Sequence, residues 1–160
     1  MKAELINPFI ESVQEIFSTM LNSNATRGQI SVSRDSKGPG ELLALIGISG
    51  ESKGTVAVSF PTDTALHIVE QMAGMKIEAV DETVVDGVAE LVNMIAGGAK
   101  AKLCTNGKKP MDLGLPSVVT GKDYHVDYPK KSIWLEVPFE SDLGSFLMRV
   151  TFESGGPLGE

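Results

Sequence analysis

The segment from Val84 to Ala101 has the apolar spacing of a long amphipathic helix, and no other pattern constrains the fold as strongly. At about 100° per residue, its apolar side chains gather on one side of the helix. They are Val84, Val88, Leu91, Val92, Ile95 and Ala99. This side has to pack against the rest of the protein, so the opposite side is expected to face water or a partner.

The opposite side of this helix carries polar groups on a background of small residues. Asp86, Glu90 and Asn93 stand at positions i, i+4 and i+7, within an arc of about 60°. Gly97 and Ala101 continue the same face. Ala89 lies beside Glu90, so another protein can approach the backbone closely. The candidate partner-binding residues are therefore Asp86, Ala89, Gly97 and Ala101.

The composition of this face favours a role beyond folding. Asn and Gly each cost about 0.5 to 1 kcal/mol relative to Ala inside a helix. Asn93 and the pair Gly97 and Gly98 therefore weaken the helix that contains them. Asp86 has a second explanation, because an acidic residue near the start of a helix also interacts favourably with the helix dipole.

The pattern D-x3-E-x2-N-x22-P, formed by Asp86, Glu90, Asn93 and Pro116, resembles the signature of the CheC/CheX/FliY family of chemotaxis phosphatases. The flanking segments GTVAVSF, GLPSVV, EVPFE and GSFLMRVTFES agree with it, so the resemblance covers nearly the whole chain. CheC-like members carry two E-x2-N copies. The segment NPFIESVQEIFSTML contains no Glu followed three residues later by Asn, which makes the chain more similar to CheX.

The resemblance implies a hydrolase of two-component signalling that removes the aspartyl phosphate of a CheY-like response regulator. In this interpretation Glu90 and Asn93 are the catalytic residues. Asn93 orients the attacking water, as a water-positioning Gln does in GTPases, and Glu90 pairs with a lysine of the regulator. The resemblance also implies a homodimer, and a Mg²⁺ ion bound by the regulator with no cofactor or metal bound by this chain. The sequence supports the homodimer only indirectly, because the last expected strand, 145–153, is apolar enough to need its pairing edge covered.

Two other functions are compatible with the same pattern. A non-catalytic scaffold or adaptor would bind response regulators or flagellar switch components through the same helix face without accelerating hydrolysis. A small-molecule-binding α+β module would require a closed apolar pocket, and no sequence feature demands one.

Other chemistry has weaker support in the sequence. His67 and His125 are expected to be packing or surface residues, and Cys104 a buried thiol. No compact array of His, Cys and Asp accompanies Asp86 and Glu90, so no metal site is expected. The segment GISGESKGT is not a phosphate-binding loop, because its Lys-Gly-Thr order leads into a strand instead of a helix.

The order of elements predicts an α+β fold, an antiparallel sheet with helices packed on it. Helices are expected at 8–21 and 65–72, and the long one opens at 81–83 and reaches the loop 105–115. Strands are expected at 29–33, 42–48, 55–60, 124–126, 132–138 and 145–153. Residues 61–64 are expected to cap the second helix, and Gly74 to end it. The resemblance implies two αββ-type halves related by a pseudo-twofold axis. We expect one domain over 1–154 and a disordered tail at 155–160.

Charge and hydropathy exclude several classes of partner. The formal net charge is −7 and the lysines are scattered, so nucleic acid is not expected as a partner, whereas a basic patch on another protein suits this surface. No apolar run approaches the 18 or so residues that a membrane span needs. The start Met1-Lys2-Ala3-Glu4 does not resemble a secretory signal, so a cytoplasmic location is expected.

Overall fold

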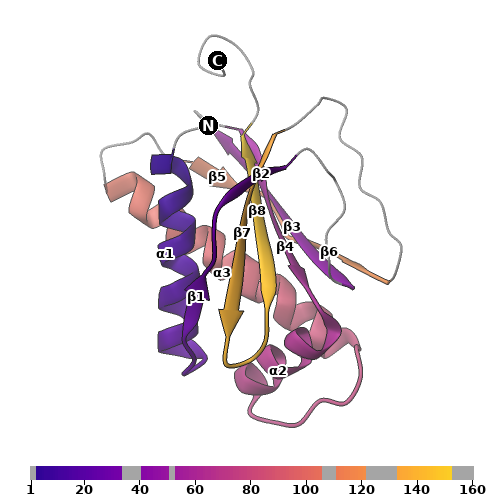
Figure 1. Cartoon of the computed structure of the whole chain (residues 1–160). Coiled ribbons are helices and arrows are strands. Elements are labelled where there is room, and N and C mark those ends of the chain that lie inside the picture. The colour runs from indigo at the N-terminus through magenta and orange to yellow at the C-terminus, as the bar shows by residue number, and fades with distance from the viewer. Residues whose placement is uncertain (1–2, 34–40, 51–52, 106–110, 122–132, 153–160) are drawn as a thin grey trace.

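The computed structural model describes residues 3–33, 41–50, 53–105, 111–121 and 133–152, and these form three helices and eight strands (Figure 1). The helices are α1 (Ala3–Met20), α2 (Thr62–Ala73) and α3 (Glu82–Thr105). The strands are β1 (Ala25–Arg27), β2 (Ser31–Ser33), β3 (Leu42–Gly50), β4 (Gly54–Phe60), β5 (Met111–Leu113), β6 (Ser117–Thr120), β7 (Trp134–Ser141) and β8 (Phe146–Phe152).

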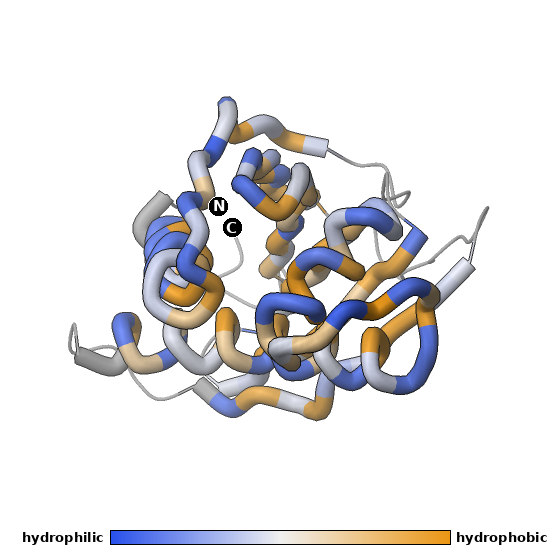
Figure 2. The backbone as a smooth tube through the Cα atoms, turned by 90° about the horizontal axis from the view of Figure 1, so that it is seen from below, coloured by the Kyte–Doolittle hydropathy of each residue, from blue (hydrophilic) through white to orange (hydrophobic). Residues whose placement is uncertain are grey.

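All eight strands join one antiparallel sheet, which confirms the predicted α+β class. The strand order is β1-β7-β8-β4-β3-β5, with β2 also paired to β7 and β6 also paired to β3. Helices α1 and α3 contact each other and lie together against the sheet, and α2 packs on α3 and β4 (Figure 1). Hydrophobic and hydrophilic residues alternate along the helices and the longer strands, as Figure 2 shows, so these elements have an apolar side to bury.

The main core fills the space between the helices and one face of the sheet. The six apolar residues predicted for the inner side of α3 are all fully buried in it. In this core the Phe146 ring stacks on both Phe17 and Phe139, with centroid distances of 5.0 and 5.1 Å. The inner side of α3 is therefore fixed by packing, and its outer side is left for other contacts.

The first half of the chain differs from the prediction at two places. Helix α1 begins at Ala3 and contains Pro8 instead of starting there, so the predicted start was wrong. Pro favours the first turn of a helix, but burial of Ile6 outweighs this local signal. The segment 22–28, where no strand was predicted, contains β1, and the strand predicted at 29–33 is reduced to β2. Such three-residue strands have no periodicity to detect and exist because β7 pairs with them.

The second half also contains more strand than predicted. The expected loop 105–115 includes β5, and β6 was not expected at all. The four residues proposed to cap α2 provide no side-chain cap, because Thr64 donates its hydroxyl to Ser145 O, whereas Gly74 ends the helix in the left-handed conformation as predicted. The strand predicted at 124–126 and the tail 155–160 lie outside the described residues, so the limits of the domain stay a prediction.

The last strand has a different place in the sheet from the one its sequence suggested. Its apolar character favoured an edge strand that a second copy of the chain would cover. In the structure β8 lies between β7 and β4 and is paired on both sides. The apolar residues of β8 are therefore buried in the core of this chain, and they give no support for a dimer.

The strand pairing shows the pseudo-twofold relation that the resemblance implied. Strands β1 and β2 both pair with β7, and strands β5 and β6 both pair with β3. A glycine follows the first strand of each pair. Gly28 donates its N–H to Pro138 O at 2.7 Å, and Gly114 donates its N–H to Gly47 O at 2.9 Å. The halves are richer than the αββ-type expected, because each supplies one helix and four strands.

The face of the sheet opposite the main core holds a second buried cluster. Leu43, Ala57 and Trp134 form it, and they alternate along their strands with residues of the main core. Arg149 on the same face is only 3% exposed. Its Nε lies 3.0 Å from Glu136 Oε2, and its guanidinium carbon lies 4.9 Å from the centroid of the Trp134 ring. A buried charge is therefore held by an ion pair and by an aromatic face.

Candidate functional site

The outward face of α3 holds the predicted site residues as an exposed row. Asp86, Glu90 and Asn93 are all exposed, although Leu91 and Val92 between them are fully buried. Ala101 is exposed further along, and Ala89 and Gly97 are partly exposed. The helix thus presents one carboxamide and two carboxylates to solvent on a surface of small residues.

The residue that caps the start of α3 is Asp81 and not Asp86. Asp81 Oδ1 accepts a hydrogen bond from Val84 N at 3.2 Å, and Asp81 O accepts one from Val85 N at 3.0 Å. Asp81 is therefore the residue that satisfies the first free N–H groups of the helix. Asp86 lies more than a turn beyond the cap, where its interaction with the helix dipole is weaker.

The two glycines in the middle of α3 have different surroundings. A Cβ at Gly98 would collide with Ser12 of α1, whose hydroxyl donates to Ile95 O at 2.8 Å. Gly98 thus has a packing reason, and the expectation that folding does not explain it was wrong. A Cβ at Gly97 would meet nothing within 4 Å. Gly97 therefore stays open to a partner on the outward face.

One cation ties the end of α3 to α1. Lys102 Nζ lies 2.6 Å from Glu15 Oε1 and 3.9 Å from Glu11 Oε2. The hydrogen bond to Glu15, together with the charges of Glu15 and Glu11, raises the pKa of Lys102 above its ordinary value. This ion-pair group lies at the surface between the helices, so its effect on stability is expected to be small.

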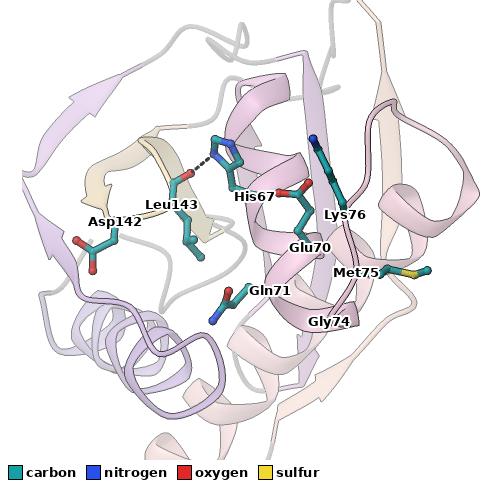
Figure 3. A pocket seen from close by; sticks show the side chains of 8 residues that line it. All are labelled: His67, Glu70, Gln71, Gly74, Met75, Lys76, Asp142 and Leu143. Atoms are coloured by element: carbon teal, nitrogen blue, oxygen red, sulfur yellow. Dashed lines mark hydrogen bonds between the residues drawn. The ribbon is translucent and has the colours of Figure 1, made fainter.

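A shallow depression lies beside α2 and the turn between β7 and β8 (Figure 3). Its lining includes His67, whose Nδ1 is 3.2 Å from Leu143 O, and Glu70, which accepts a hydrogen bond from Ile77 N at 2.9 Å. These side chains hold the neighbouring loop and turn in place, which agrees with the predicted surface role of His67. None of its lining residues belongs to α3. The depression is open and partly polar, unlike the closed apolar pocket of the small-molecule hypothesis.

The described residues form no metal cluster and no membrane-spanning helix. Among the described residues, no three His, Cys, Asp or Glu side chains gather as metal ligands would. None of the helices described is both long and apolar enough to cross a bilayer. His125 lies outside the described residues, as does the side chain of Cys104.

Solved structures of similar shape define the class of protein. A CheC-like superfamily protein from a Shewanella species superimposes with a TM-score of 0.86 and 34% identity, covering 96% of this chain and 99% of that one. A complex from Borrelia burgdorferi, CheX with CheY, BeF3 and Mg, contains a chain that superimposes with a TM-score of 0.79 and 21% identity, covering 95% and 99%. The sheet with its exposed helix is therefore a CheC-like fold.

Sequence comparison specifies the family within this class. The family described as chemotaxis phosphatase CheX matches residues 42–140. A Thermotoga maritima protein named CheY-P phosphatase CheX is 32% identical over 157 residues, which cover 98% of this chain and 100% of that protein. The chain belongs to the CheX family of chemotaxis phosphatases.

One pair of residues was missed by the sequence analysis. Because α1 begins at Ala3, it contains Glu4 and Asn7, which have the same spacing as Glu90 and Asn93. The E-x2-N pattern was present in the sequence. Because the helix was expected to start at Pro8, Glu4 lay outside the predicted helix. The N-terminal part of the chain thus contains an E-x2-N copy after all.

Proposed function

We propose that this protein hydrolyses the aspartyl phosphate of a phosphorylated CheY-type response regulator in chemotaxis. One observation carries the proposal: the Asn93 carboxamide is exposed beside Glu90 on the outward face of α3. The Thermotoga relative is named a CheY-P phosphatase, and the Borrelia structure is a CheX–CheY complex with BeF3 and Mg. Both support a regulator as the substrate.

Asn93 and Glu90 have different roles in the proposed reaction, one in orienting water and the other in docking. The regulator supplies the phosphoryl group, a Mg²⁺ ion and a lysine, and it lacks an ordered water in line with the bond to be broken. The carbonyl oxygen of Asn93 accepts a hydrogen bond from this water and fixes it for attack. Glu90, about one helical turn away, pairs with the regulator's lysine and sets the position of docking. No cofactor on this chain takes part.

The test is phosphate release from a purified CheY-type regulator phosphorylated in the presence of Mg²⁺. We expect the protein to accelerate release well above the regulator's own rate, and to bind the phosphorylated form more tightly than the unphosphorylated one. Equal binding of both forms with no acceleration would instead identify the scaffold function and overturn the proposal.

Replacement of Glu90 by alanine is expected to weaken docking more than chemistry. An ion pair with a lysine contributes about 1.5 to 3 kcal/mol, so KM should rise about ten- to a hundredfold with a smaller change in kcat. Steady-state kinetics over a range of regulator concentrations measure both constants. Glu90→Gln, which keeps the size and removes the charge, should behave like Glu90→Ala. A fall in kcat at unchanged KM would contradict a docking role.

The two central glycines of α3 provide a matched pair of variants. Gly97→Leu adds a side chain where the structure has open space, so the free energy of unfolding should stay within about 1 kcal/mol of wild type. The same side chain stands on the docking face and should weaken regulator binding about tenfold or more. Gly98→Leu should instead destabilise the fold, because Ser12 occupies that space. Chemical denaturation and a binding titration separate the two effects, and tight binding by Gly97→Leu would exclude docking on this face.

The same proposal includes a cytoplasmic homodimer, as the family resemblance implied. The sheet offers a surface for a second copy at its edges, where the short strands β1 and β2 lie on one side and β5 lies on the other. Val32 in β2 is 64% exposed. Sedimentation velocity at several protein concentrations measures the mass directly, and a monomer throughout would contradict the dimer.

A further inference from the structure

The edge of the sheet formed by β5 and β6 contains a β-bulge. Ile48 of β3 pairs with Leu113 at the end of β5. Leu45 of β3 pairs with Ser117 at the start of β6. Three residues on the edge, 114–116, therefore face two residues of β3. A bulge of this kind leaves one residue without a partner in the ladder and changes the direction of its side chain.

Leu115 is the residue of this bulge that is left in water. Gly114 keeps a partner in β3, because it donates its N–H to Gly47 O at 2.9 Å. Leu115 is 91% exposed, the largest exposure among the large hydrophobic residues that the structure describes. Because Pro116 follows it, the backbone of Leu115 is restricted to extended conformations. The bulge thus presents one apolar side chain in a restricted position, without covering it.

The other half of the sheet has the same bulge with a polar residue in this place. There, the three residues 28–30 face two residues of β7. Gly28 donates its N–H across that bulge, as Gly114 does in the first one. Gln29 then takes the place of Leu115, and it is exposed as well. The bulge therefore forms with a polar residue at this position, so folding does not require a leucine there.

The bulge lies beside the helix that carries the proposed site. Helix α3 contacts both β5 and β6. Leu113 and Val118, in the strands on either side of the bulge, pack against the main core that the inner side of α3 helps to form. Among the described strands, none lies beyond β5 and β6, so the bulge stands at the edge of the sheet. A protein that covers the outward face of α3 has this edge next to it.

A stable protein interface is wider than the row of site residues on α3. Standard interfaces bury about 800 Å² of each partner, with about 20 to 30 residues on each side. A regulator seated on α3 therefore has to contact a neighbouring element as well. On one side of α3, helix α1 carries the charged and exposed Glu11 and Glu15, which pair with Lys102. On the other side the sheet edge offers Leu115, and the centres of interfaces favour apolar residues over charged ones.

We propose that Leu115 is an apolar docking residue for the phosphorylated response regulator, held beside α3 by the bulge at 114–116. This inference rests on the proposed function of α3. The partner surface has to present an apolar patch close to the phosphorylated aspartate of the regulator. Leu115 takes no part in the reaction at Asn93. Burial of its side chain under the regulator stabilises the docked complex.

The deciding experiment compares wild type with Leu115→Gln, which introduces the residue that the other half of the sheet carries in this place. Phosphate release from a CheY-type regulator, phosphorylated in the presence of Mg²⁺, is measured over a range of regulator concentrations. Loss of the buried leucine should raise KM about ten- to a hundredfold and leave kcat within about twofold of wild type. An unchanged KM would overturn the proposal.

Three controls separate an apolar contact from other effects. Leu115→Met keeps the apolar surface and should keep KM near the wild-type value, whereas a rise as large as that of Leu115→Gln would contradict an apolar contact. Met75→Gln removes another exposed apolar side chain, 61% exposed and beyond the end of α2, and should leave KM unchanged. An equal rise there would show that Leu115 has no special place. Urea denaturation should give the same midpoint for Leu115→Gln and wild type, and a lower midpoint would make Leu115 a folding residue.

A second copy of the chain is the competing occupant of this edge. Sedimentation velocity should give the same mass for wild type and Leu115→Gln. Loss of a dimer in Leu115→Gln would assign the leucine to a contact between copies and overturn the proposal.

The outcomes also separate this inference from the proposed function. If wild type accelerates release and Leu115→Gln leaves KM unchanged, the function of α3 stands and the docking role of Leu115 falls. If wild type gives no acceleration, the proposed function itself fails, and this inference falls with it.

Discussion

Asn93→Ala should release phosphate from a saturating regulator about 10² to 10³-fold more slowly than wild type, which corresponds to about 3 to 4 kcal/mol of transition-state stabilisation. In the proposed mechanism the carboxamide contacts the attacking water, and it is not part of the core, because Asn93 is exposed on α3. Its loss should therefore lower kcat and leave the fold unchanged. Alanine is also the better helix former, so the free energy of unfolding should rise slightly.

Two further variants define the role of the carboxamide. Asn93→Asp keeps the shape but brings a negative charge towards the phosphoryl group, so it should be at least as slow as Asn93→Ala. Lys100→Ala, about two turns along the same helix, should retain nearly the full rate. Single-turnover phosphate release gives these rates directly. A wild-type rate in Asn93→Ala would remove the proposed mechanism, whatever the binding data show.

Arg149→Ala should lower the free energy of unfolding by about 3 kcal/mol, because it breaks a buried ion pair. The guanidinium is 3% exposed and lies 3.0 Å from Glu136. Its removal leaves a cavity beside Trp134 and takes away the counter-charge of a partly buried carboxylate. Because the pair is largely shielded from solvent, added salt should change this loss little.

Arg149→Met is the control for the charge alone. Methionine refills most of the volume, and the Glu136 side chain is still 22% exposed and can reach water. The cost should therefore fall to about 1 kcal/mol or less. Urea denaturation of both variants provides the comparison. Equal losses in Arg149→Ala and Arg149→Met would show that the ion pair, and not packing, accounts for the stabilisation.

The helix that carries the candidate site was largely predictable from the sequence. The predicted helix, opened by 81–83 and ended at the loop from 105, agrees closely with α3 at Glu82–Thr105. Its buried side was predicted residue by residue, since a spacing of 3.6 residues per turn is a local property. The exposure of Glu90 and Asn93 follows from the same period. Their roles in hydrolysis stay a prediction.

The neighbourhood of this helix was less predictable. Strands β1, β5 and β6 are too short to show alternation, and each pairs with a strand from the other half of the chain. The sequence favoured a functional role for Gly98, whereas the structure shows that its contact with Ser12 requires a glycine. The last strand was predicted to be an edge strand, because the apolar residues of a strand do not reveal how many strands pair with it. In each case the partner comes from a distant part of the chain.

The sequence by itself determined the helices, the longer strands, the inner side of α3 and the motif that marks the family, because these depend on neighbours within a few residues. Only the tertiary structure decided the order of the strands, the ion pair of Arg149 with Glu136, and the pseudo-twofold relation of the sheet. These depend on pairing and packing between residues far apart in the chain, where many arrangements satisfy the same local pattern and burial of the common core selects one.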